Sequence, residues 1–374
     1  MYQFYHTNVY MKKLLIYYLC NINTFGNAYH SKGWNVAKRL QSDSRLTTTK
    51  FRNGVENSLS PILLFPGLGA SKLLQNNETV YPPNFQQYFC NYDEWKHNII
   101  LNKNLKTLPF GDKKSFELNV VSSLIKINRY ENLLRNLDCI YPMPYDFRLI
   151  DNREYLHNLY NNIRLYIEHF NCPVTLLCHS TGGLLMHWFI HQQKQNWCNK
   201  HIKNIININV PFGGIPFVLE NCINDKTNLN KLLGKEIFCS LGATVWNMPD
   251  VRFLQDPVIK VDGKIIRDYL DFFELHDIQS RVLQNKDIID SFKIGTNVKT
   301  YIIYSTTEPL NKTPITLNIN TKYKHKHIIS TTYGNGDGIV PLESLLIPKL
   351  WDMSDDNLFF HHIPNSEHSS ILFR

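Results

Sequence analysis

The sequence predicts an α/β fold in which a mostly parallel sheet is covered by helices. Short apolar runs, typical of buried strands, lie at residues 61–69, 174–178 and 204–210. An amphipathic segment at residues 152–171 and an apolar helix after Ser180 alternate with these runs. Alternation of strands and helices favours a parallel sheet, because a crossover between parallel strands needs a connection of about a helix in length.

The N-terminal residues 1–28 have the layout of a secretory signal peptide. From Met11, two lysines precede an apolar stretch, and the small residues Gly26 and Ala28 provide a cleavage site. We therefore expect a mature N-terminus near Tyr29, with Met11 as an alternative translation start. The protein would then enter the secretory pathway and be secreted or vacuolar and lysosome-like, peripheral on membranes.

After the leader, residues 29–60 are polar and turn-rich, and we expect a loose arm there. Residues 61–374 are predicted to form one domain, because 374 residues at 43% hydrophobic content can build one large core. Two stretches, at about 75–115 and 211–298, lack the strand–helix rhythm and are predicted to be insertions. Their aromatic residues predict a lid and membrane-binding surface.

Trp95 and Trp246 are the aromatic residues that we expect to be exposed in these insertions, along with the methionine at position 248. The later strands of the domain are predicted at 299–305 and 358–363, which are again short apolar runs.

Composition excludes several classes of protein. The formal net charge is +8, but Lys and Arg are scattered, without a basic block or a stacked-aromatic module, so no nucleic-acid partner is predicted. No run after the leader reaches the roughly 18 apolar residues of a membrane-spanning helix. The eight cysteines lack zinc-ligand spacing, and Cys222 and Cys239 are the pair that a surface loop would bring together. Sequons at 77–79 and 311–313 fit secretion.

The stretch "LLCHSTGGLL" places Ser180 between a predicted strand and a predicted helix. A serine in a sharp strand-to-helix turn is typical of a nucleophile elbow, whose usual pattern is G-x-S-x-G. Here Cys178 stands where the first glycine is usual, while Gly182 and Gly183 allow the helix to pack close to the strand. The alternative interpretation is that Ser180 is an N-cap on a core helix.

An elbow serine needs a base, and an acid to orient that base. Asp337 lies in the glycine-rich loop "YGNGDGIVPLESL" after a predicted strand, and His368 lies in "PNSEHSSIL" after the last predicted strand. The order Ser, Asp, His is the order of the α/β-hydrolases. The backbone N–H groups of Thr181 and of Leu68, in "FPGLG", are the expected oxyanion donors.

Other histidine clusters, at 325–327 and 361–362, have the composition of metal ligands, but neighbouring lysines and a strand setting favour a solvated or core position. We therefore predict no metal and no cofactor.

Six short motifs occur in the order found in the lecithin:cholesterol acyltransferase and lysosomal phospholipase A family. They are "PILLFPGLGASKL", "YPMPYDFRL", "HSTGG", "NVPFGG", "GDGIVPLESL" and "EHSSIL", and together they span roughly residues 60–374. The chain thus resembles this α/β-hydrolase family. The resemblance implies a nucleophile at Ser180, an acid at Asp337 and a base at His368. It also implies that Asp146 and Arg148, in "YDFR", form a structural ion pair near the site.

This resemblance implies a lipid acyl hydrolase or acyltransferase that forms an acyl-enzyme. Its partners would be a membrane or lipoprotein phospholipid surface and an acyl acceptor, which is water, a sterol or another lipid alcohol. The sequence leaves hydrolysis and acyl transfer open. An esterase acting on soluble esters and a non-catalytic lipid-binding protein are the alternatives.

Overall fold

The computed structural model describes residues 60–116, 139–224, 234–254, 256, 258–321 and 327–373. The predicted leader, and the arm up to residue 59, lie outside the described residues.

Six parallel strands form the central sheet, as the alternating pattern predicts. Across the sheet the order is β12, β9, β6, β5, β1 and β4, and every neighbouring pair is parallel. The strands are β1 (Ile62–Phe65), β4 (Ile140–Pro142), β5 (Val174–His179), β6 (Ile202–Ile208), β9 (Thr300–Ser305) and β12 (Leu358–Ile363). The strand predictions at the beginning, middle and end of the domain are therefore confirmed.

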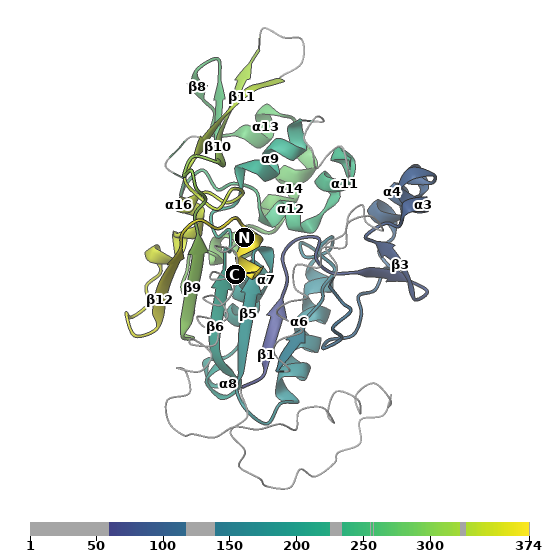
Figure 1. Ribbon diagram of the computed structural model, residues 1–374, viewed down its shortest axis with the longest axis vertical. Coiled ribbons are helices and arrows are strands. Elements are labelled where there is room, and N and C mark those ends of the chain that lie inside the picture. The colour runs from purple at the N-terminus through teal and green to yellow at the C-terminus, as the bar shows by residue number, and fades with distance from the viewer. Residues whose placement is uncertain are drawn as a thin grey trace, which may run out of the picture.

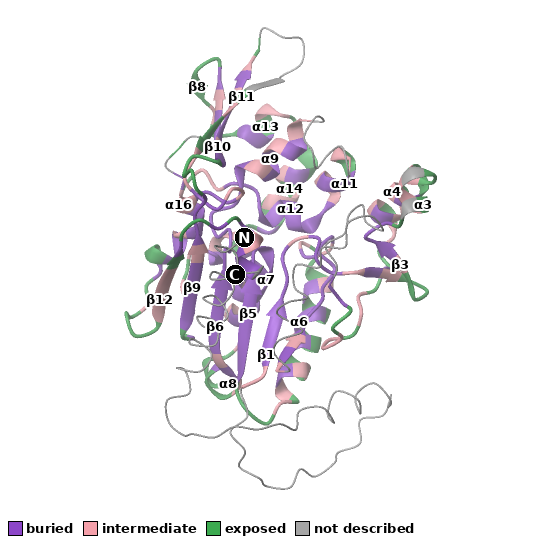
Figure 2. Cartoon of the chain, viewed as in Figure 1, coloured by how far each residue is buried: buried purple, intermediate pink, exposed green. Residues whose placement is uncertain are grey.

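Both faces of this sheet are buried, which explains why its strands are continuous apolar runs rather than alternating ones. In β1, Leu63 and Phe65 belong to one hydrophobic cluster, whereas Ile62 and Leu64 belong to another. Successive side chains of a strand point to opposite faces, so the two clusters lie on the two sides of the sheet. Figure 2 shows β1, β5 and β6 as buried along most of their length, whereas the edge strand β12 is mostly of intermediate burial.

The predicted amphipathic helix is α6 (Arg153–Glu168), and its apolar stripe is buried as expected. Asn152 caps the helix by accepting a hydrogen bond from the Tyr155 N–H. Helix α7 (Thr181–His191) follows β5 directly and packs against β5 and β1, and α8 (Gln195–His201) leads into β6. These helices join successive strands of the sheet.

The 211–298 insertion is a folded cap rather than an irregular segment. Its helices are α9 (Pro216–Ile223), α11 (Lys235–Ser240), α12 (Gly242–Trp246), α13 (Tyr269–Phe272), α14 (His276–Gln284) and α15 (Lys286–Ser291). It also contains two strands, β7 (Ile259–Val261) and β8 (Lys264–Ile265). Figure 1 shows these elements gathered at one end of the central sheet.

A second, four-stranded sheet completes the cap. Its order is β11, β10, β7 and β8, in which β10 (Thr313–Asn320) and β11 (His327–Gly334) come from beyond the predicted insertion. Strand β10 pairs in parallel with β7 and antiparallel with β11. The cap is therefore built from segments that precede β9 in the sequence and from segments that follow it. Three short helical segments complete this part of the chain, α16 (Leu342–Leu345), η1 (Ile347–Leu350) and η2 (Ser370–Phe373).

The 75–115 insertion also has regular structure, contrary to the irregular segment that we expected. A hairpin of β2 (Leu73–Gln75) and β3 (Glu78–Tyr81) precedes α3 (Phe85–Phe89) and α4 (Tyr92–Leu101). Figure 1 shows α3 and α4 together at one side of the molecule.

The predicted exposure of the tryptophans is wrong. Trp95 is buried and donates from Nε1 to the carbonyl oxygen of Val80 at 2.8 Å, so it anchors α4 to the hairpin. Trp246 and Met248 are buried as well. Large aromatic side chains contribute more to stability when packed than in solvent, and both tryptophans belong to the buried hydrophobic cluster. Among the described residues, no helix has both the length and the hydropathy needed to cross a bilayer.

Candidate functional site

Ser180 occupies a strained turn between β5 and α7. Its backbone has φ 53° and ψ −132°, which is unusual for a residue other than glycine. The Ser180 N–H donates to the carbonyl oxygen of Ile208 at 3.0 Å, which fixes the turn against β6. Strain held in place by its surroundings is typical of functional positions, and a strained serine here is the geometry of a nucleophile elbow.

The glycines after Ser180 are required by close packing. A Cβ atom on Gly182 would lie 2.5 Å from the carbonyl oxygens of Phe65 and Pro66, and one on Gly183 would lie 2.2 Å from Val210 Cγ2. Any larger residue would push α7 away from the ends of β1 and β6. Cys178, which replaces the first glycine of the usual pattern, is fully buried in the core. Burial raises the pKa of the Cys178 thiol well above its ordinary value, so the thiol stays neutral.

His368 connects Ser180 to Asp337. His368 Nε2 lies 2.9 Å from Ser180 Oγ, and His368 Nδ1 lies 2.6 Å from Asp337 Oδ2. One hydrogen-bonded series thus joins three residues that are far apart in the sequence. Asp337 follows Ser180 by 157 positions, and His368 follows Asp337 by 31. All three residues are buried. A hydroxyl, an imidazole and a carboxylate in this series can deprotonate the hydroxyl and stabilise the resulting imidazolium.

The Asp337 carboxylate is fixed by its own loop. Its Oδ1 accepts hydrogen bonds from the N–H groups of Ile339 at 3.0 Å and Val340 at 2.7 Å, and its carbonyl oxygen accepts from the His368 N–H at 2.8 Å. The preceding strand, β11, belongs to the cap sheet. A hydrogen bond from the Thr307 N–H to the Gly336 carbonyl oxygen nevertheless holds the loop beside the end of β9.

Two further observations concern the Ser180 side chain, and the second bears on the alternative in which Ser180 is an N-cap. Ser180 is 6% exposed, so its hydroxyl is less open to solvent than an elbow serine is expected to be. Its Oγ makes no capping hydrogen bond to α7, although Ser180 occupies the N-cap position. The contact with His368 accounts for the orientation of the hydroxyl.

Two backbone N–H groups are available beside Ser180. Gly67 approaches so closely that a Cβ atom there would lie 3.0 Å from Ser180 Cβ, which brings the turn containing Leu68 against the elbow. Thr181 is the first residue of α7, so its N–H has no acceptor within the helix. In the described part of the chain, the N–H groups of Leu68 and Thr181 donate to no protein acceptor.

The segment "YDFR" supports this turn. The Tyr145 hydroxyl donates to the Pro66 carbonyl oxygen at 2.8 Å. Arg148 forms a buried two-pronged ion pair with Asp146, with Nη2 2.6 Å from Oδ2 and Nε 2.9 Å from Oδ1. Arg148 Nη1 also donates to the carbonyl oxygens of Ile99 and Asn102 at the end of α4. The pair therefore ties the 75–115 insertion to the site without contacting Ser180.

Sequence reasoning missed two residues that hold His368 in place. His179 Nε2 lies 3.0 Å from the His368 carbonyl oxygen, and Asn209 Nδ2 donates to the same oxygen at 3.2 Å. Asn209 also bridges to Ser305, with Nδ2 2.8 Å from Ser305 Oγ. Polar residues at the carboxyl ends of β5 and β6 were the available signal, since such ends meet at one edge of a parallel sheet.

Cys222 and Cys239 are not joined by a disulfide. Cys222 is buried rather than in a surface loop, and Cys239 Sγ lies 4.0 Å from the Cys222 carbonyl oxygen. Residues 325 and 326, in the first of the two histidine clusters considered from the sequence, lie outside the described residues. Within the described ranges, no group of three or more potential ligand side chains is arranged to hold a metal ion.

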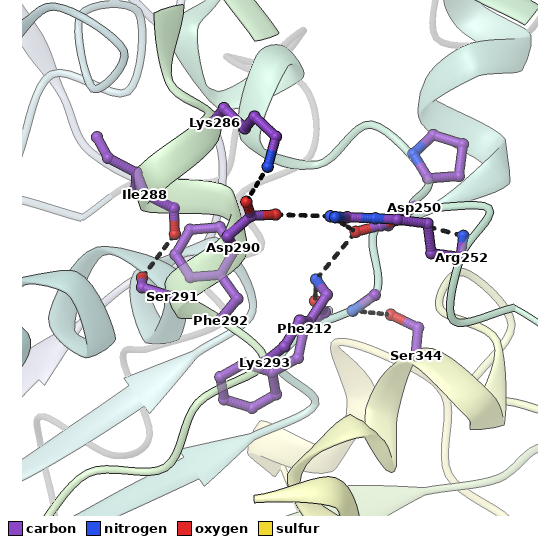
Figure 3. Close-up of polar contacts among 12 residues, drawn as sticks. Phe212, Asp250, Arg252, Lys286, Ile288, Asp290, Ser291, Phe292, Lys293 and Ser344 are labelled. Carbon is purple, nitrogen blue, oxygen red and sulfur yellow. Dashed lines mark hydrogen bonds and ion pairs between the residues drawn. The ribbon is translucent and has the colours of Figure 1, made fainter. Parts of the chain in front are cut away.

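A charged cluster fixes the loop after β6 to the cap (Figure 3). Asp250 lies between Arg252, at 2.7 Å, and Lys293, at 3.7 Å, and Lys293 also donates to the Phe212 carbonyl oxygen. Arg252 contacts Asp290 at 2.7 Å as well. Burial lowers the pKa of Lys293 to about 8, and the charge of Asp250 opposes that shift.

The parallel sheet, the elbow and the loops at its carboxyl edge define the fold of an α/β-hydrolase. A chain of the solved Tle4–Tli4 complex has a similar fold, with a TM-score of 0.52 and 12% identity, covering 84% of this chain and 95% of that one. A family model described as lecithin:cholesterol acyltransferase matches residues 128–289, which include Ser180.

Curated relatives agree with that match. The chain is 26% identical over 245 residues to "Lysosomal phospholipase A and acyltransferase" of Homo sapiens, covering 61% of this chain and 58% of the relative. It is 24% identical over 246 residues to "Phosphatidylcholine-sterol acyltransferase" of Gallus gallus, covering 62% of this chain and 58% of the relative. The matches thus span less than two thirds of each relative. They confirm the resemblance to the lecithin:cholesterol acyltransferase and lysosomal phospholipase A family.

Proposed function

We propose that this protein is a lipid acyl hydrolase or acyltransferase, of the phospholipase A or phospholipid:sterol/lipid O-acyltransferase type. The observation that carries the proposal is the series of contacts from Ser180 through His368 to Asp337 beside two available N–H groups. In this proposal Ser180 is the nucleophile, His368 the general base and acid, and Asp337 the group that orients the imidazole.

The proposed reaction has two stages. Ser180 Oγ attacks the ester carbonyl while His368 Nε2 takes the hydroxyl proton, and the N–H groups of Leu68 and Thr181 stabilise the oxyanion. The C–O bond to the leaving alcohol then breaks, and His368 returns the proton to that alcohol. In the second stage, water or an acceptor alcohol attacks the acyl-enzyme and gives its proton to His368. The bond between Ser180 Oγ and the acyl carbon then breaks, His368 returns the proton to Ser180 Oγ, and the acid or the new ester leaves. Asp337 keeps its negative charge throughout and stabilises the imidazolium.

Lipid rather than soluble substrates are supported by the relatives, whose names specify phospholipase and sterol acyltransferase activities. We propose a membrane or lipoprotein phospholipid surface as the partner, and water, a sterol or another lipid alcohol as the acyl acceptor. The name of the human relative also supports a secretory or lysosomal route for this chain, which the predicted leader would initiate.

Fluorophosphonate labelling tests the nucleophile. The reagent should attach to the wild-type protein and not to Ser180→Ala, because the label reacts with an activated serine. A protein that binds phospholipid vesicles but does not label would instead be a non-catalytic lipid-binding relative.

A comparison of substrates tests the lipid specificity. Phosphatidylcholine should be cleaved faster in micelles than below its critical micelle concentration, since an enzyme of lipid surfaces gains by adsorbing to them. Equal rates per molecule in both forms would indicate an esterase of soluble esters.

A further inference from the structure

Two buried polar side chains meet directly beside Ser180. Asn247, the residue that ends α12, donates from Nδ2 to Thr181 Oγ1 at 2.9 Å and to the Ala243 carbonyl oxygen at 2.7 Å. Thr181 is 1% exposed and Asn247 is 0% exposed. The contact therefore joins the cap to the first residue of α7, inside the protein.

The neighbouring carbonyl group fixes the orientation of the Asn247 amide. A carbonyl oxygen only accepts hydrogen bonds, so the amide atom 2.7 Å from Ala243 O must be the NH₂ group. Its two hydrogens are then used on Ala243 and on Thr181, and Thr181 Oγ1 is the acceptor. Consequently the Thr181 hydroxyl hydrogen points away from Asn247, and none of the described residues accepts it.

The position of this hydroxyl follows from covalent geometry. Three bonds separate Oγ1 of a threonine from its own backbone N, so the two donors of Thr181 lie within about 4 Å of each other. The N–H is one of the groups proposed to bind the oxyanion. Because the hydroxyl lies this close to the N–H, it is within reach of the same reacting group. An oxyanion bound there can accept more than two hydrogen bonds, so a third donor can be used.

We propose that the Thr181 hydroxyl is a third hydrogen-bond donor to the reacting ester, beside the N–H groups of Leu68 and Thr181. Asn247 is then a positioning residue, because it holds Oγ1 as an acceptor and directs its hydrogen toward the substrate. This inference rests on the proposed function and adds a donor to the same site. It also gives the cap a part in the chemistry, since Asn247 comes from the cap.

The second atom of the amide supports a functional rather than a packing role. Asn247 Oδ1 is buried and has no hydrogen-bond partner among the described residues. A buried unpartnered acceptor lowers stability, and an apolar residue of the same size would avoid that cost. Ala243 O would keep a donor without the amide, because the Asn247 backbone N–H also donates to it at 3.1 Å. An asparagine at position 247 is thus better explained by its orientation of the Thr181 hydroxyl than by packing.

The test compares four variants of the full chain with a soluble p-nitrophenyl ester. Thr181→Val removes the hydroxyl and keeps the shape, and Thr181→Ser is its matched control because it keeps the hydroxyl. Asn247→Leu removes the amide, and the fourth variant combines Thr181→Val with Asn247→Leu. For each variant we would measure kcat, KM, the rate of fluorophosphonate labelling and the melting temperature.

Loss of one oxyanion donor typically lowers kcat by about 100-fold to 1000-fold. We expect Thr181→Val to lower kcat by at least about 10-fold, with KM nearly unchanged, and Thr181→Ser to keep most of the activity. Asn247→Leu should lower kcat without lowering the melting temperature. The double variant should be no worse than Thr181→Val, because Asn247 acts through the hydroxyl.

Three results would overturn the inference: wild-type kcat in Thr181→Val, an equal loss in Thr181→Ser, or losses that multiply in the double variant. If Asn247→Leu fails to fold, the matched Thr181 pair still decides, since each of these variants changes the side chain by only one heavy atom. Failure of the proposed function would be seen separately, in a wild-type protein that neither labels nor cleaves the ester. An active wild type with an unaffected Thr181→Val would refute only the third donor.

Discussion

At the scale of single residues, Ser180 is held by its contacts with His368 and β6 rather than by capping α7. Ser180→Ala removes only the oxygen of a small side chain, and the strained turn remains fixed by the hydrogen bond from its N–H to Ile208. We therefore expect phospholipid acyl release to fall by at least about 1000-fold, while the melting temperature changes little. Micellar turnover and a thermal melt on the same preparation check both parts.

Combinations of variants provide the control for this prediction. His368→Ala and Asp337→Ala should each cripple the enzyme, and adding Ser180→Ala to either should lower activity hardly further, because the three groups act as one unit. If Ser180 served only as a helix cap, its loss would cost about 1 kcal/mol of stability and leave activity intact. A destabilised but active Ser180→Ala protein would thus refute the triad.

At the scale of elements, α7 carries a buried histidine that should make the fold sensitive to acid. His187 Nε2 lies 2.8 Å from the Ile294 carbonyl oxygen and 3.0 Å from that of Ser291, so it carries a hydrogen and donates. Burial, together with the nearby His191 and Lys293, lowers the pKa of His187 to about 3, although the two backbone hydrogen bonds oppose that shift. The imidazole therefore stays neutral in the folded protein at pH values where an unfolded chain would protonate it.

The sign of the effect follows from linkage. Between pH 6.5 and about pH 3 the unfolded state binds a proton that the folded state does not, so stability falls as the pH falls. The loss contributed by His187 is about 2 kcal/mol at pH 5 relative to pH 8. His187→Gln keeps an amide donor and does not titrate, so its stability difference between these two pH values should be smaller by a similar amount. Urea unfolding at both pH values measures this, and an unchanged difference would exclude His187 as the cause.

The charged cluster at the base of the cap gives a second prediction at this scale (Figure 3). Asp250→Asn removes the carboxylate that faces both Arg252 and the nearly buried Lys293, whose side chain is 8% exposed. An uncompensated buried ammonium is costly, so we expect a loss of about 3 kcal/mol in the free energy of unfolding. Denaturant titration checks the value.

Asp287→Asn is the matched control for that cluster. It breaks the ion pair with Arg153, in which the side chains are 60% and 48% exposed. Exposed pairs contribute little, so this variant should change stability by no more than about 0.5 kcal/mol. Equal losses in the two variants would show that burial of Lys293 is not the source of the effect.

The contrast between the elements that could be predicted and those that could not has a physical cause. Strands β1, β5, β6 and β12 and helix α6 were predicted because their own residues carry the apolar pattern. Strand β7 could not be predicted, because a segment of three residues forms a strand only through its pairing with β10, which lies more than fifty positions later in the sequence. The same limit applies to the site. The elbow and the loops of Asp337 and His368 have local signatures, whereas the contact of Asn247 with Thr181 depends on how the cap docks.

At the scale of the whole molecule, the two insertions lie at the end and side of the central sheet (Figure 1). We proposed from the sequence that they contact the lipid surface, and the burial of Trp95 and Trp246 moves that proposal to other residues. The apolar side chains that the described parts of the insertions expose include Leu101 on α4, at 59%, and Leu283 on α14, at 66%. These leucines are available to enter a membrane without unfolding the core.

Leu101→Asp and Leu283→Asp should therefore weaken binding to phosphatidylcholine vesicles, by about 10-fold each if the leucine enters the lipid, because burying one leucine contributes about 1.5–3 kcal/mol. Cleavage of a short soluble ester should survive, since neither side chain lies at Ser180. Leu165→Asp is the control, because Leu165 is 64% exposed on α6 beside the central sheet, outside both insertions. Vesicle co-sedimentation measures binding for the three variants. Equal weakening in all three would show a general effect of added negative charge, and no weakening in Leu101→Asp and Leu283→Asp would place the lipid-binding surface elsewhere on the molecule.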